Sequence, residues 1–347
     1  MMKSLNVSRR NFLHQSMAAT GMTVLGTHGV STDYIDKNTE YRKLPREVWI
    51  ASFSQMGLYA ETPELMAKKV LEVLKELKPF KPDFVCLPEV FAFTNVKKDY
   101  AKSERPVISN DILEHFSEFS RENKCYTICP AYTADDRERI YNSAVVLDRQ
   151  GNQIGKYDKI HPTVDEIDDG TSPGSLFQPA IKTDSGIIGI QICFDVLWDD
   201  GWAMCRKQGA EMIFFSSAFP AGQMINTKAW QHKCVVVSST NKHTSKICDI
   251  TGEEIAKTGI WNANLCCASV NLEKAFLHLW PYVRRFPDII SKYGRDVRIT
   301  MFHEEEWAII ESLSPDVRVH DILKEYELKT HEELTESSEI IQNKART

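Results

Sequence analysis

The sequence lacks a strong charge imbalance, a nucleic-acid-binding pattern and, after its N-terminal segment, any long apolar run. Its 347 residues carry a formal net charge of -6, so no overall basic field would attract nucleic acid. No basic stripe with interleaved aromatic residues stands out, and no later apolar stretch is long enough to span a bilayer. We therefore expect no nucleic-acid partner and no membrane span beyond the N-terminal segment.

A disulfide framework is also lacking, although the chain holds nine cysteines. They are scattered and mostly lie in apolar, strand-like runs, as Cys86, Cys129 and Cys234 do, and their odd number leaves at least one thiol unpaired within the chain. Hydrophobic residues make up 42% and charged residues 26% of the chain, values typical of a soluble globular protein. A cysteine nucleophile would be one reason for a free thiol.

The N-terminal segment has the features of an export signal. Residues 8–13 read Ser-Arg-Arg-Asn-Phe-Leu and precede a mildly apolar, small-residue stretch over 16–30. A positive region followed by a short apolar region is typical of secretory signals, and the arginine pair resembles the twin-arginine signal. We predict an export signal over 1–31, a linker over 32–45, and a periplasmic protein or one anchored by an uncleaved signal. The alternative is a disordered tail with a chance arginine pair.

Beyond the linker, strand-like runs alternate with amphipathic helical segments, which indicates a layered α/β structure. Turn signals at 148–152 and around Thr251 predict two hairpins, so the sheet is not purely parallel. The predicted strands cover 48–51, 84–87, 126–131, 141–147, 153–157, 186–192, 212–215, 234–238 and 265–270, and a helix-like stretch covers 199–209. We predict one domain over 46–275 and a charged, helical C-terminal extension over 276–347 that contacts a second subunit or covers the site.

Cys193 is the first candidate nucleophile. It directly follows the apolar run 187–192 and precedes Phe194 and Asp195. A sharp turn from strand to helix would present its sulfur at the sheet edge, where backbone N–H groups lower a thiol pKa and bind an oxyanion. The alternative is a buried core cysteine, which is the usual place of a free thiol.

Glu89 and Lys159 also stand at predicted strand ends. Glu89 follows the apolar run 84–88, and open α/β sheets place ligand sites at the carboxyl ends of their strands. Lys159 lies in the segment 156–162, Lys-Tyr-Asp-Lys-Ile-His-Pro, at the end of the hairpin. Taken singly, the first could be a solvated strand end and the second an ordinary surface lysine.

In this order, Leu-Pro-Glu, Tyr-x-Lys-x-His and Ile-Cys-Phe-Asp resemble the nitrilase, or carbon–nitrogen hydrolase, superfamily. The segments 141–144, 173–174, 186–189 and 209–213 resemble further parts of that family, and the resemblance spans roughly 47–275. It implies a four-layer αββα sandwich with mixed sheets. It also implies a homodimer or a higher homo-oligomer.

The resemblance further implies a catalytic triad of Glu89, Lys159 and Cys193. The thiol would give its proton to the glutamate and attack an amide carbonyl or nitrile carbon, forming a thioester. The lysine and the backbone N–H of Phe194 would stabilise the developing negative charge. Glu166 is the best match to a second glutamate that helps to position water, and Asp165 is its rival if the loop register differs. No metal or organic cofactor is implied.

Two segments depart from the family pattern. Residues 196–200 read Val-Leu-Trp-Asp-Asp where many members have an Arg-Phe-Pro-Glu-like run, and 228–232 read Lys-Ala-Trp-Gln-His where Arg-Ala-x-Glu-Asn is expected. The first segment usually lines the pocket, so Trp198, together with Phe219, is a weak candidate for a pocket residue. As lone aromatic residues, both are more often part of a core.

A metal site and a histidine base are the other chemical alternatives. The set His232, Cys234, His243 and Cys248 mixes ligand types but matches no tight zinc spacing, and the first two would share one face of a strand. His161 fits a loop histidine that orders the lysine segment better than a papain-like base. We expect no metal.

The sequence therefore predicts a cysteine hydrolase that cleaves an amide or carbamoyl bond, with nitriles as the second choice on family grounds. A catalytically silent binding protein on the same fold is one alternative, motivated by the two departing segments. Acyl transfer to an amine is the other. The substrate would be a small molecule.

Overall fold

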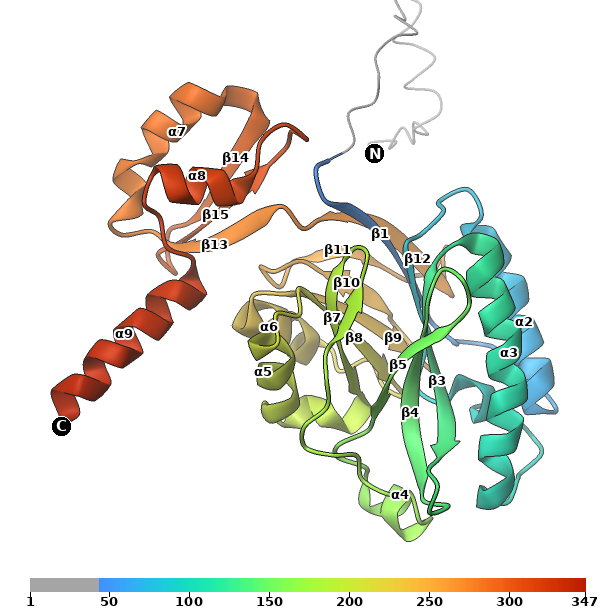
Figure 1. The fold of residues 1–347 in the computed structure, drawn as a ribbon. Coiled ribbons are helices and arrows are strands. Elements are labelled where there is room, and N and C mark those ends of the chain that lie inside the picture. The colour runs from blue at the N-terminus through green and yellow to red at the C-terminus, as the bar shows by residue number, and fades with distance from the viewer. Residues whose placement is uncertain (1–43) are drawn as a thin grey trace, which may run out of the picture. The chain divides into compact units, whose positions relative to one another are not determined.

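The computed structural model describes residues 44–347 (Figure 1). The predicted export signal over 1–31 and nearly all of the 32–45 linker lie outside the described residues. Among the helices of the described range, none is both long and apolar enough to cross a membrane. The strands of this range form two six-stranded sheets and one three-stranded sheet.

The first six-stranded sheet has a parallel centre and antiparallel edges. Its strands stand in the order β12-β1-β2-β3-β4-β5, and β1, β2 and β3 run parallel to one another. These central strands are buried along most of their length, as expected for strands covered on both faces. Their bounds are β1 (Glu47–Phe53), β2 (Phe84–Cys86), β3 (Tyr126–Ala134), β4 (Ile140–Leu147), β5 (Gln153–Asp158) and β12 (Leu265–Asn271).

The second six-stranded sheet repeats this arrangement. Its order is β11-β10-β9-β8-β7-β6, with β7, β8 and β9 parallel. The β4–β5 and β10–β11 hairpins confirm the mixed sheets that the turn signals predicted. The bounds are β6 (Ile181–Thr183), β7 (Gly186–Ile192), β8 (Met212–Ser217), β9 (Val235–Thr240), β10 (Lys246–Cys248) and β11 (Glu254–Lys257).

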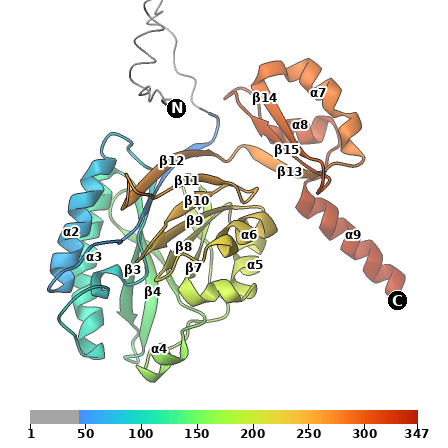
Figure 2. The same cartoon turned by 180° about the vertical axis from the view of Figure 1, so that it is seen from behind.

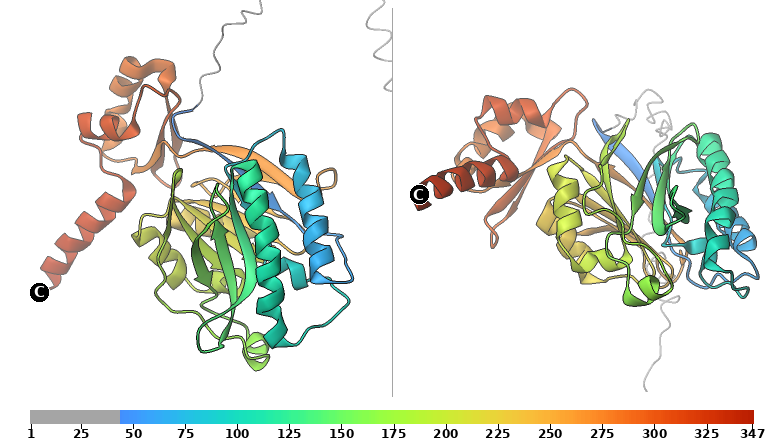
Figure 3. Two further views of the ribbon diagram at one scale, coloured as in Figure 1. Left: turned by 45° about the vertical axis from the view of Figure 1, so that its right-hand side comes forward. Right: turned by 60° about the horizontal axis from the view of Figure 1, so that its bottom comes forward.

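The two sheets pack face to face, and helices cover their outer faces. One core joins Ile50 and Phe84 of the first sheet to Phe214 and Val237 of the second, and the rings of Phe84 and Phe214 lie 5.3 Å apart. Figure 3 shows the four layers side by side, and Figure 2 shows them from behind, which confirms the predicted αββα sandwich. The covering helices are α2 (Pro63–Leu74) and α3 (Arg105–Asn123) on the first sheet, and α5 (Asp200–Lys207) and α6 (Gln223–His232) on the second.

The start of α2 shows how local sequence sets an element. The Thr62 side chain accepts a hydrogen bond from the backbone N–H of Leu65, and Pro63 occupies the first turn, where its missing N–H leaves nothing unpaired. Met66 and Val70 then share the buried face of the helix. The outer layer over the first sheet therefore begins at this capped turn.

The C-terminal extension is not wholly helical, which corrects the prediction. β15 lies between β13 and β14 in a three-stranded antiparallel sheet. The acidic run 304–306 lies in the turn between β14 and β15 and not in a helix. The bounds are β13 (Lys274–His278), β14 (Val297–Phe302), β15 (Trp307–Ser312), α7 (Phe286–Tyr293), α8 (Val319–Glu325) and α9 (His331–Arg346). The short helical segments elsewhere include α4 (Val164–Asp168), η1 (Lys75–Leu77), η2 (Phe91–Phe93), η3 (Lys102–Glu104), η4 (Cys193–Leu197), η5 (Tyr282–Arg284) and η6 (Gly294–Asp296).

Candidate active site

The three residues predicted as the triad come from separate strand ends and meet between the two sheets. Glu89 follows β2, Lys159 follows β5, and Cys193 begins η4 directly after β7. Their exposed fractions are only 4%, 1% and 8%, respectively. Charged groups buried to this degree need partners, because an unpaired buried charge is strongly destabilising.

Lys159 lies at the centre of the cluster. Its Nζ donates to Oε1 of Glu89 and to Oε2 of Glu166, both at 2.7 Å. Burial alone would lower the pKa of Lys159, but the negative charges of Glu89 and Glu166 outweigh it and hold the pKa above its ordinary value. The lysine is therefore a fixed positive charge at neutral pH.

Glu89 is held by hydrogen bonds at both ends of its carboxylate. Oε1 accepts from Asn142 Nδ2 at 2.8 Å, and Oε2 accepts from the backbone N–H of Ala218 at 2.9 Å. The backbone carbonyl of Glu89 also accepts from Asn241 Nδ2 at 3.0 Å. These contacts fix the carboxylate in one orientation.

Asn142 is a site residue that sequence reasoning did not single out. Its Nδ2 bridges Glu89 and Glu166, at 2.8 Å from an oxygen of each. It helps to hold two carboxylates around one ammonium. The sequence does offer a signal for this residue: a polar amide close to the apolar run 144–147, within the segment 141–144 that resembles the family.

Glu166 enters the cluster from α4 through a capping box. The Thr163 side chain accepts from the Glu166 backbone N–H at 3.2 Å, and the Glu166 carboxylate accepts from the Thr163 N–H at 2.8 Å. Burial would raise the pKa of Glu166, but Lys159 and then Asn142 outweigh this effect and lower it. The neighbouring Asp165 is exposed, so Glu166 is the acid that contacts the lysine.

Cys193 occupies the sharp turn that the sequence predicted. Its backbone angle φ is +47°, in the left-handed region that residues other than glycine rarely adopt. Burial and, next, the negative charge of Glu89 raise the pKa of its thiol to about 12, against the opposing effect of Lys159. The resting thiol is therefore protonated at neutral pH and needs a base before it can attack.

Asp195 fixes this turn to the lysine segment. The buried carboxylate accepts hydrogen bonds from Tyr157 Oη at 2.9 Å, from the His161 backbone N–H at 2.8 Å and from the Ile192 N–H at 3.0 Å. The His161 ring nitrogen Nδ1 lies 3.0 Å from the same carboxylate, and this hydrogen bond raises the pKa of His161. His161 thus lies where a residue that orders the lysine segment is expected.

The predicted pocket aromatics, Trp198 and Phe219, lie in the segments that follow Cys193 and β8, respectively. The Phe194 ring meets Trp198 edge to face at 5.1 Å, and Trp198 stacks on His161 at 4.1 Å. Trp198 is 39% exposed, whereas Phe219 packs partly buried against the core. Phe219 follows Ala218, so the loop after β8 carries both the Glu89 contact and this ring.

The residues weighed as metal ligands do not form a site. His232 lies at the end of α6, which corrects the expectation that it shares a strand face with Cys234. Its Nε2 lies 2.8 Å from Asp199 Oδ1. Within residues 44–347, no group of three or more His, Cys, Asp or Glu side chains is arranged to hold a metal ion.

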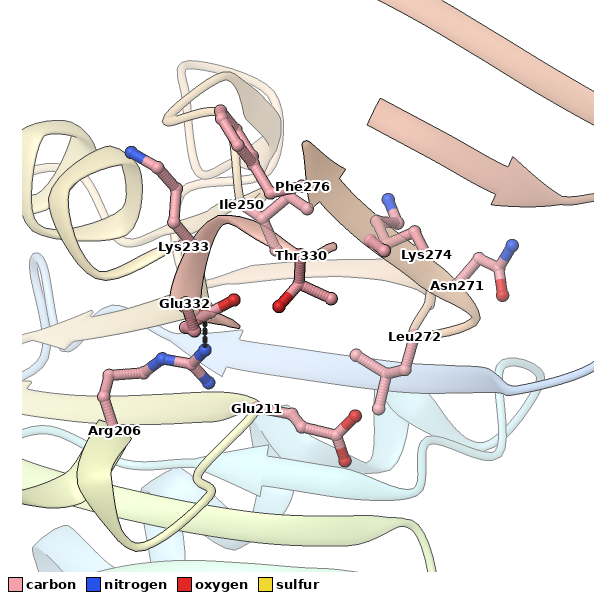
Figure 4. Close-up of a pocket in the computed structure, with 11 residues that line it drawn as sticks. Arg206, Glu211, Lys233, Ile250, Asn271, Leu272, Lys274, Phe276, Thr330 and Glu332 are labelled. Atoms are coloured by element: carbon pink, nitrogen blue, oxygen red, sulfur yellow. Dashed lines mark hydrogen bonds and ion pairs between the residues drawn. The ribbon is translucent and has the colours of Figure 1, made fainter. Parts of the chain in front are cut away.

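A pocket of about 140 Å³ lies where β13 and the start of α9 meet Arg206 of α5 and the loops next to β8, β9 and β10 (Figure 4). Arg206 and Glu332, two of its lining residues, form an ion pair at 2.6 Å. None of the three predicted triad residues lines it. The cluster around Lys159 therefore remains the candidate active site.

Comparisons with known proteins identify the family of this chain. The carbon-nitrogen hydrolase family model matches residues 50–276. The deaminated glutathione amidase of Mus musculus is 24% identical over 262 residues, which cover 65% of this chain and 80% of the relative. Two solved structures share the fold at a TM-score of 0.59. The carbon-nitrogen hydrolase from Helicobacter pylori G27 is 17% identical and covers 73% of this chain and 96% of its own. An amidase from Nesterenkonia sp. is 13% identical and covers 67% and 93%, respectively. This chain belongs to the carbon–nitrogen hydrolase family, whose members act on C–N bonds other than peptide bonds.

Proposed function

We propose that this enzyme hydrolyses a small amide or carbamoyl compound through a thioester on Cys193, with Glu89 as general base and Lys159 as the electrostatic stabiliser. One observation carries the proposal: a buried ammonium lies 2.7 Å from each of two carboxylates, beside a thiol at a strained turn. Burying charges costs stability even when they are paired, so a buried cluster of charges is a candidate functional site. Perturbed groups around a nucleophile are typical of a catalytic site.

The acylation step follows from the positions of these groups. The Glu89 carboxylate takes the proton from the Cys193 thiol, and the thiolate attacks the carbonyl carbon to form a C–S bond. Lys159 and the backbone N–H of Phe194 stabilise the oxyanion. The C–N bond then breaks, and the leaving nitrogen takes the proton from Glu89 and departs as ammonia or an amine.

Deacylation reverses the proton path. Water gives a proton to Glu89 while its oxygen attacks the thioester carbonyl, and Glu166 with Asn142 helps to orient the water. The C–S bond breaks, the acid product leaves, and the sulfur recovers its proton from Glu89. The raised thiol pKa, about 12, makes the general base necessary, because free thiolate is scarce at neutral pH.

Amide substrates are favoured over nitriles by the relatives. A mutant of the Nesterenkonia amidase carries the acetamide moiety of fluoroacetamide covalently at its active-site cysteine. The Mus musculus relative is a deaminated glutathione amidase. Acyl transfer to an amine remains a second outcome, in which the amine replaces water in deacylation. A silent binding protein is disfavoured by the complete set of buried contacts around Lys159.

We further propose that the chain is exported through the twin-arginine route and acts in the periplasm or from an uncleaved anchor. We also propose that it forms a homodimer or a higher homo-oligomer. The first proposal rests on residues 8–13 and the second on the family resemblance. Cell fractionation, compared between the natural chain and an Arg9→Lys, Arg10→Lys variant, tests the route. Light scattering of the purified protein tests the oligomer.

The activity is tested by ammonia release from a panel of amides, carbamoyl compounds and nitriles, with Cys193→Ala as the control. Fluoroacetamide labelling followed by mass spectrometry reads the same site without a known substrate. We expect turnover that the variant lacks and an adduct on Cys193. A wild-type enzyme without turnover and with an unlabelled Cys193 would contradict the proposal and favour a binding protein. Adding hydroxylamine to the assay tests the thioester itself, because an amine that captures the acyl group from the sulfur yields a hydroxamate and the free thiol.

A further inference from the structure

The helix α9 is held to the rest of the chain at its start. The His331 ring meets Trp307 with centroids 4.6 Å apart, and Glu332 pairs with Arg206 at 2.6 Å. Beyond this first turn the helix leads away from the extension, as Figures 1 and 2 show from opposite sides. None of the sixteen residues that the structure describes in this helix is buried, and all residues from 339 to 347 are exposed. The far half of α9 therefore faces solvent in a single copy of the chain.

The sequence of α9 does not favour a helix without packing. A capping box stabilises its start, where Thr330 accepts from the Glu333 N–H at 3.2 Å and the Glu333 carboxylate accepts from the Thr330 N–H at 2.8 Å. The rest of the helix contains many residues of modest helix propensity, namely Thr335, Ser337, Ser338, Ile340, Ile341 and Asn343. Helices of about this length are marginal in water, and most helical stability comes from packing an apolar face. The far half of α9 therefore needs a packing partner.

One face of α9 is suited to such packing. Leu334, Ser338, Ile341 and Ala345 are spaced by four, three and four residues, so they form one line along the helix, here called the α9 stripe. Ile341 in this stripe is 67% exposed. The adjacent Ile340 lies on a different face, where it lines a groove of about 720 Å³ between α8 and α9. This groove accounts for the position of Ile340 but not for that of the stripe.

The α9 stripe complements itself when two copies of the helix run antiparallel. With the overlap centred on the middle of the helix, Leu334 of one copy faces Ala345 of the other. Ser338 of one copy likewise faces Ile341 of the other. Each contact then joins a large side chain to a small one, which lets packed helices interdigitate. A parallel pair in register would instead set Ser338 against Ser338 and leave a gap there.

The charges along α9 favour the same direction. The acidic residues lie in positions 331–339 and the basic residues lie in the last turn. They are Glu332, Glu333, Glu336 and Glu339 against Lys344 and Arg346. Antiparallel copies place the acidic part of one helix beside the basic end of the other, whereas parallel copies place acids beside acids. With four acidic and two basic residues, the helix also suits a second copy better than an anionic lipid surface.

We infer that two copies of this chain associate through α9, with the two helices paired antiparallel along the α9 stripe. The inference rests on the proposed homo-oligomer, which it deepens by naming the surface. The contact is isologous, since the same residues serve on both sides. Association also supplies the packing that the far half of α9 lacks in one copy.

Cysteine cross-linking of the full-length protein tests the direction of pairing. Leu334→Cys and Ala345→Cys are made as separate variants and treated with a short bismaleimide. A mixture of the two is expected to give a cross-linked dimer, because the antiparallel pair sets these positions opposite each other. Neither variant alone should give one, because its two cysteines lie at opposite ends of the pair. The wild type gives the background, since its cysteines are buried or half-buried.

A cross-link in each variant alone and none in the mixture would show a parallel pair and overturn the inference. The absence of any cross-link above the wild-type background would overturn it as well.

Light scattering of the full-length protein tests the stripe. Ile341→Asp is expected to lower the mass by about twofold, because it places a charge in both halves of an isologous contact. Ile340→Asp is the matched control, since it makes the same change one residue earlier on a different face, and it should keep the mass. Amide turnover should be unchanged in both variants. Equal effects of the two variants on the mass would contradict the inference.

The same measurements separate this inference from the proposed function. If the wild type is an oligomer, Ile341→Asp keeps its mass and no cross-link forms, only the inference fails. If the wild type is a monomer at all concentrations, the inference and the proposed oligomer fail together, while ammonia release still tests the amidase. Wild-type binding to phosphatidylglycerol vesicles that Ile341→Asp loses, without any cross-link, would assign α9 to a membrane surface and also overturn the inference.

Discussion

Two ion-pair clusters of this molecule are built alike and differ in charge balance. In the central cluster, Lys159 lies 2.7 Å from both Glu89 and Glu166, so one ammonium faces two carboxylates and a thiol. The second cluster lies at the base of the extension. There Lys274 lies 3.0 Å from Asp249 and 3.7 Å from Glu311.

The second cluster is balanced by one more cation. Arg298 contacts Glu311 at 2.5 Å, which gives two carboxylates and two cations. The central cluster keeps an excess of negative charge in a buried place. Burial and, next, the negative charge of Glu89 raise the pKa of the Cys193 thiol. Similar contacts thus balance charge in one place and leave a net negative charge beside a thiol in the other.

Removing the nucleophile is expected to have the largest effect. Cys193→Ala should lower kcat/KM for the best amide by at least about 10⁴-fold, because the covalent route is lost. The melting temperature should change little, since the sulfur makes few stabilising contacts that alanine cannot replace. Ammonia release and thermal unfolding measure the two effects.

The matched control for this variant is Cys267→Ala, which removes a half-buried thiol on β12 far along the chain. It should keep full activity. Substantial residual turnover in Cys193→Ala would remove the cysteine from the mechanism.

The second prediction compares the two lysines directly. Lys159→Met leaves two buried carboxylates facing each other and should destabilise the fold by roughly 3–5 kcal/mol while abolishing activity. Lys274→Met should cost only about 1–3 kcal/mol, because Arg298 still pairs with Glu311, and it should retain activity. Urea unfolding and the amide assay separate the two variants. Equal effects of both on activity would mean that the extension contributes to the site.

The coming together of Glu89, Lys159 and Cys193 was predictable because each residue follows a strand end. Glu89 and Cys193 each come directly after a buried apolar run, and the sheet edge brings such positions together. Their partners were less visible. Asn142 contacts Glu89 and Glu166 across separations of 53 and 24 residues, and the sequence pattern does not encode such distances.

The balanced cluster was missed for a related reason. The strands β14 and β15 flank the acidic run 304–306, which also suits an exposed helix, and only the pairing of the two strands shows them as a sheet. The ion pair between Asp199 and Lys228 was likewise not predicted, since each of the two segments that carry these residues departs from the family pattern on its own. Long-range pairing decides both cases, and local propensity does not.

The third prediction uses pH to sharpen the comparison. The folded-state pKa of Glu166 lies below its ordinary value, so its contribution to stability is present above about pH 5 and is lost as the pH falls through the folded-state pKa. The unfolding free energy should therefore fall on acidification, and Glu166→Gln should flatten part of that fall. Urea unfolding at several pH values measures it. An unchanged slope in the variant would place the acid sensitivity elsewhere.

The smallest effect is expected at the exposed rim of the extension. Arg206 pairs with Glu332 at 2.6 Å, but the Glu332 side chain is 52% exposed, so water and salt screen the pair. Arg206→Ala should change the unfolding free energy by no more than about 1 kcal/mol and leave activity intact. In contrast to this pair, Trp307 and His331 meet with ring centroids 4.6 Å apart and tie α9 to β15 by apolar contact, which salt does not screen. If Arg206→Ala nevertheless proves strongly destabilising at low salt and much less so at high salt, the ion pair rather than the ring contact holds the start of α9.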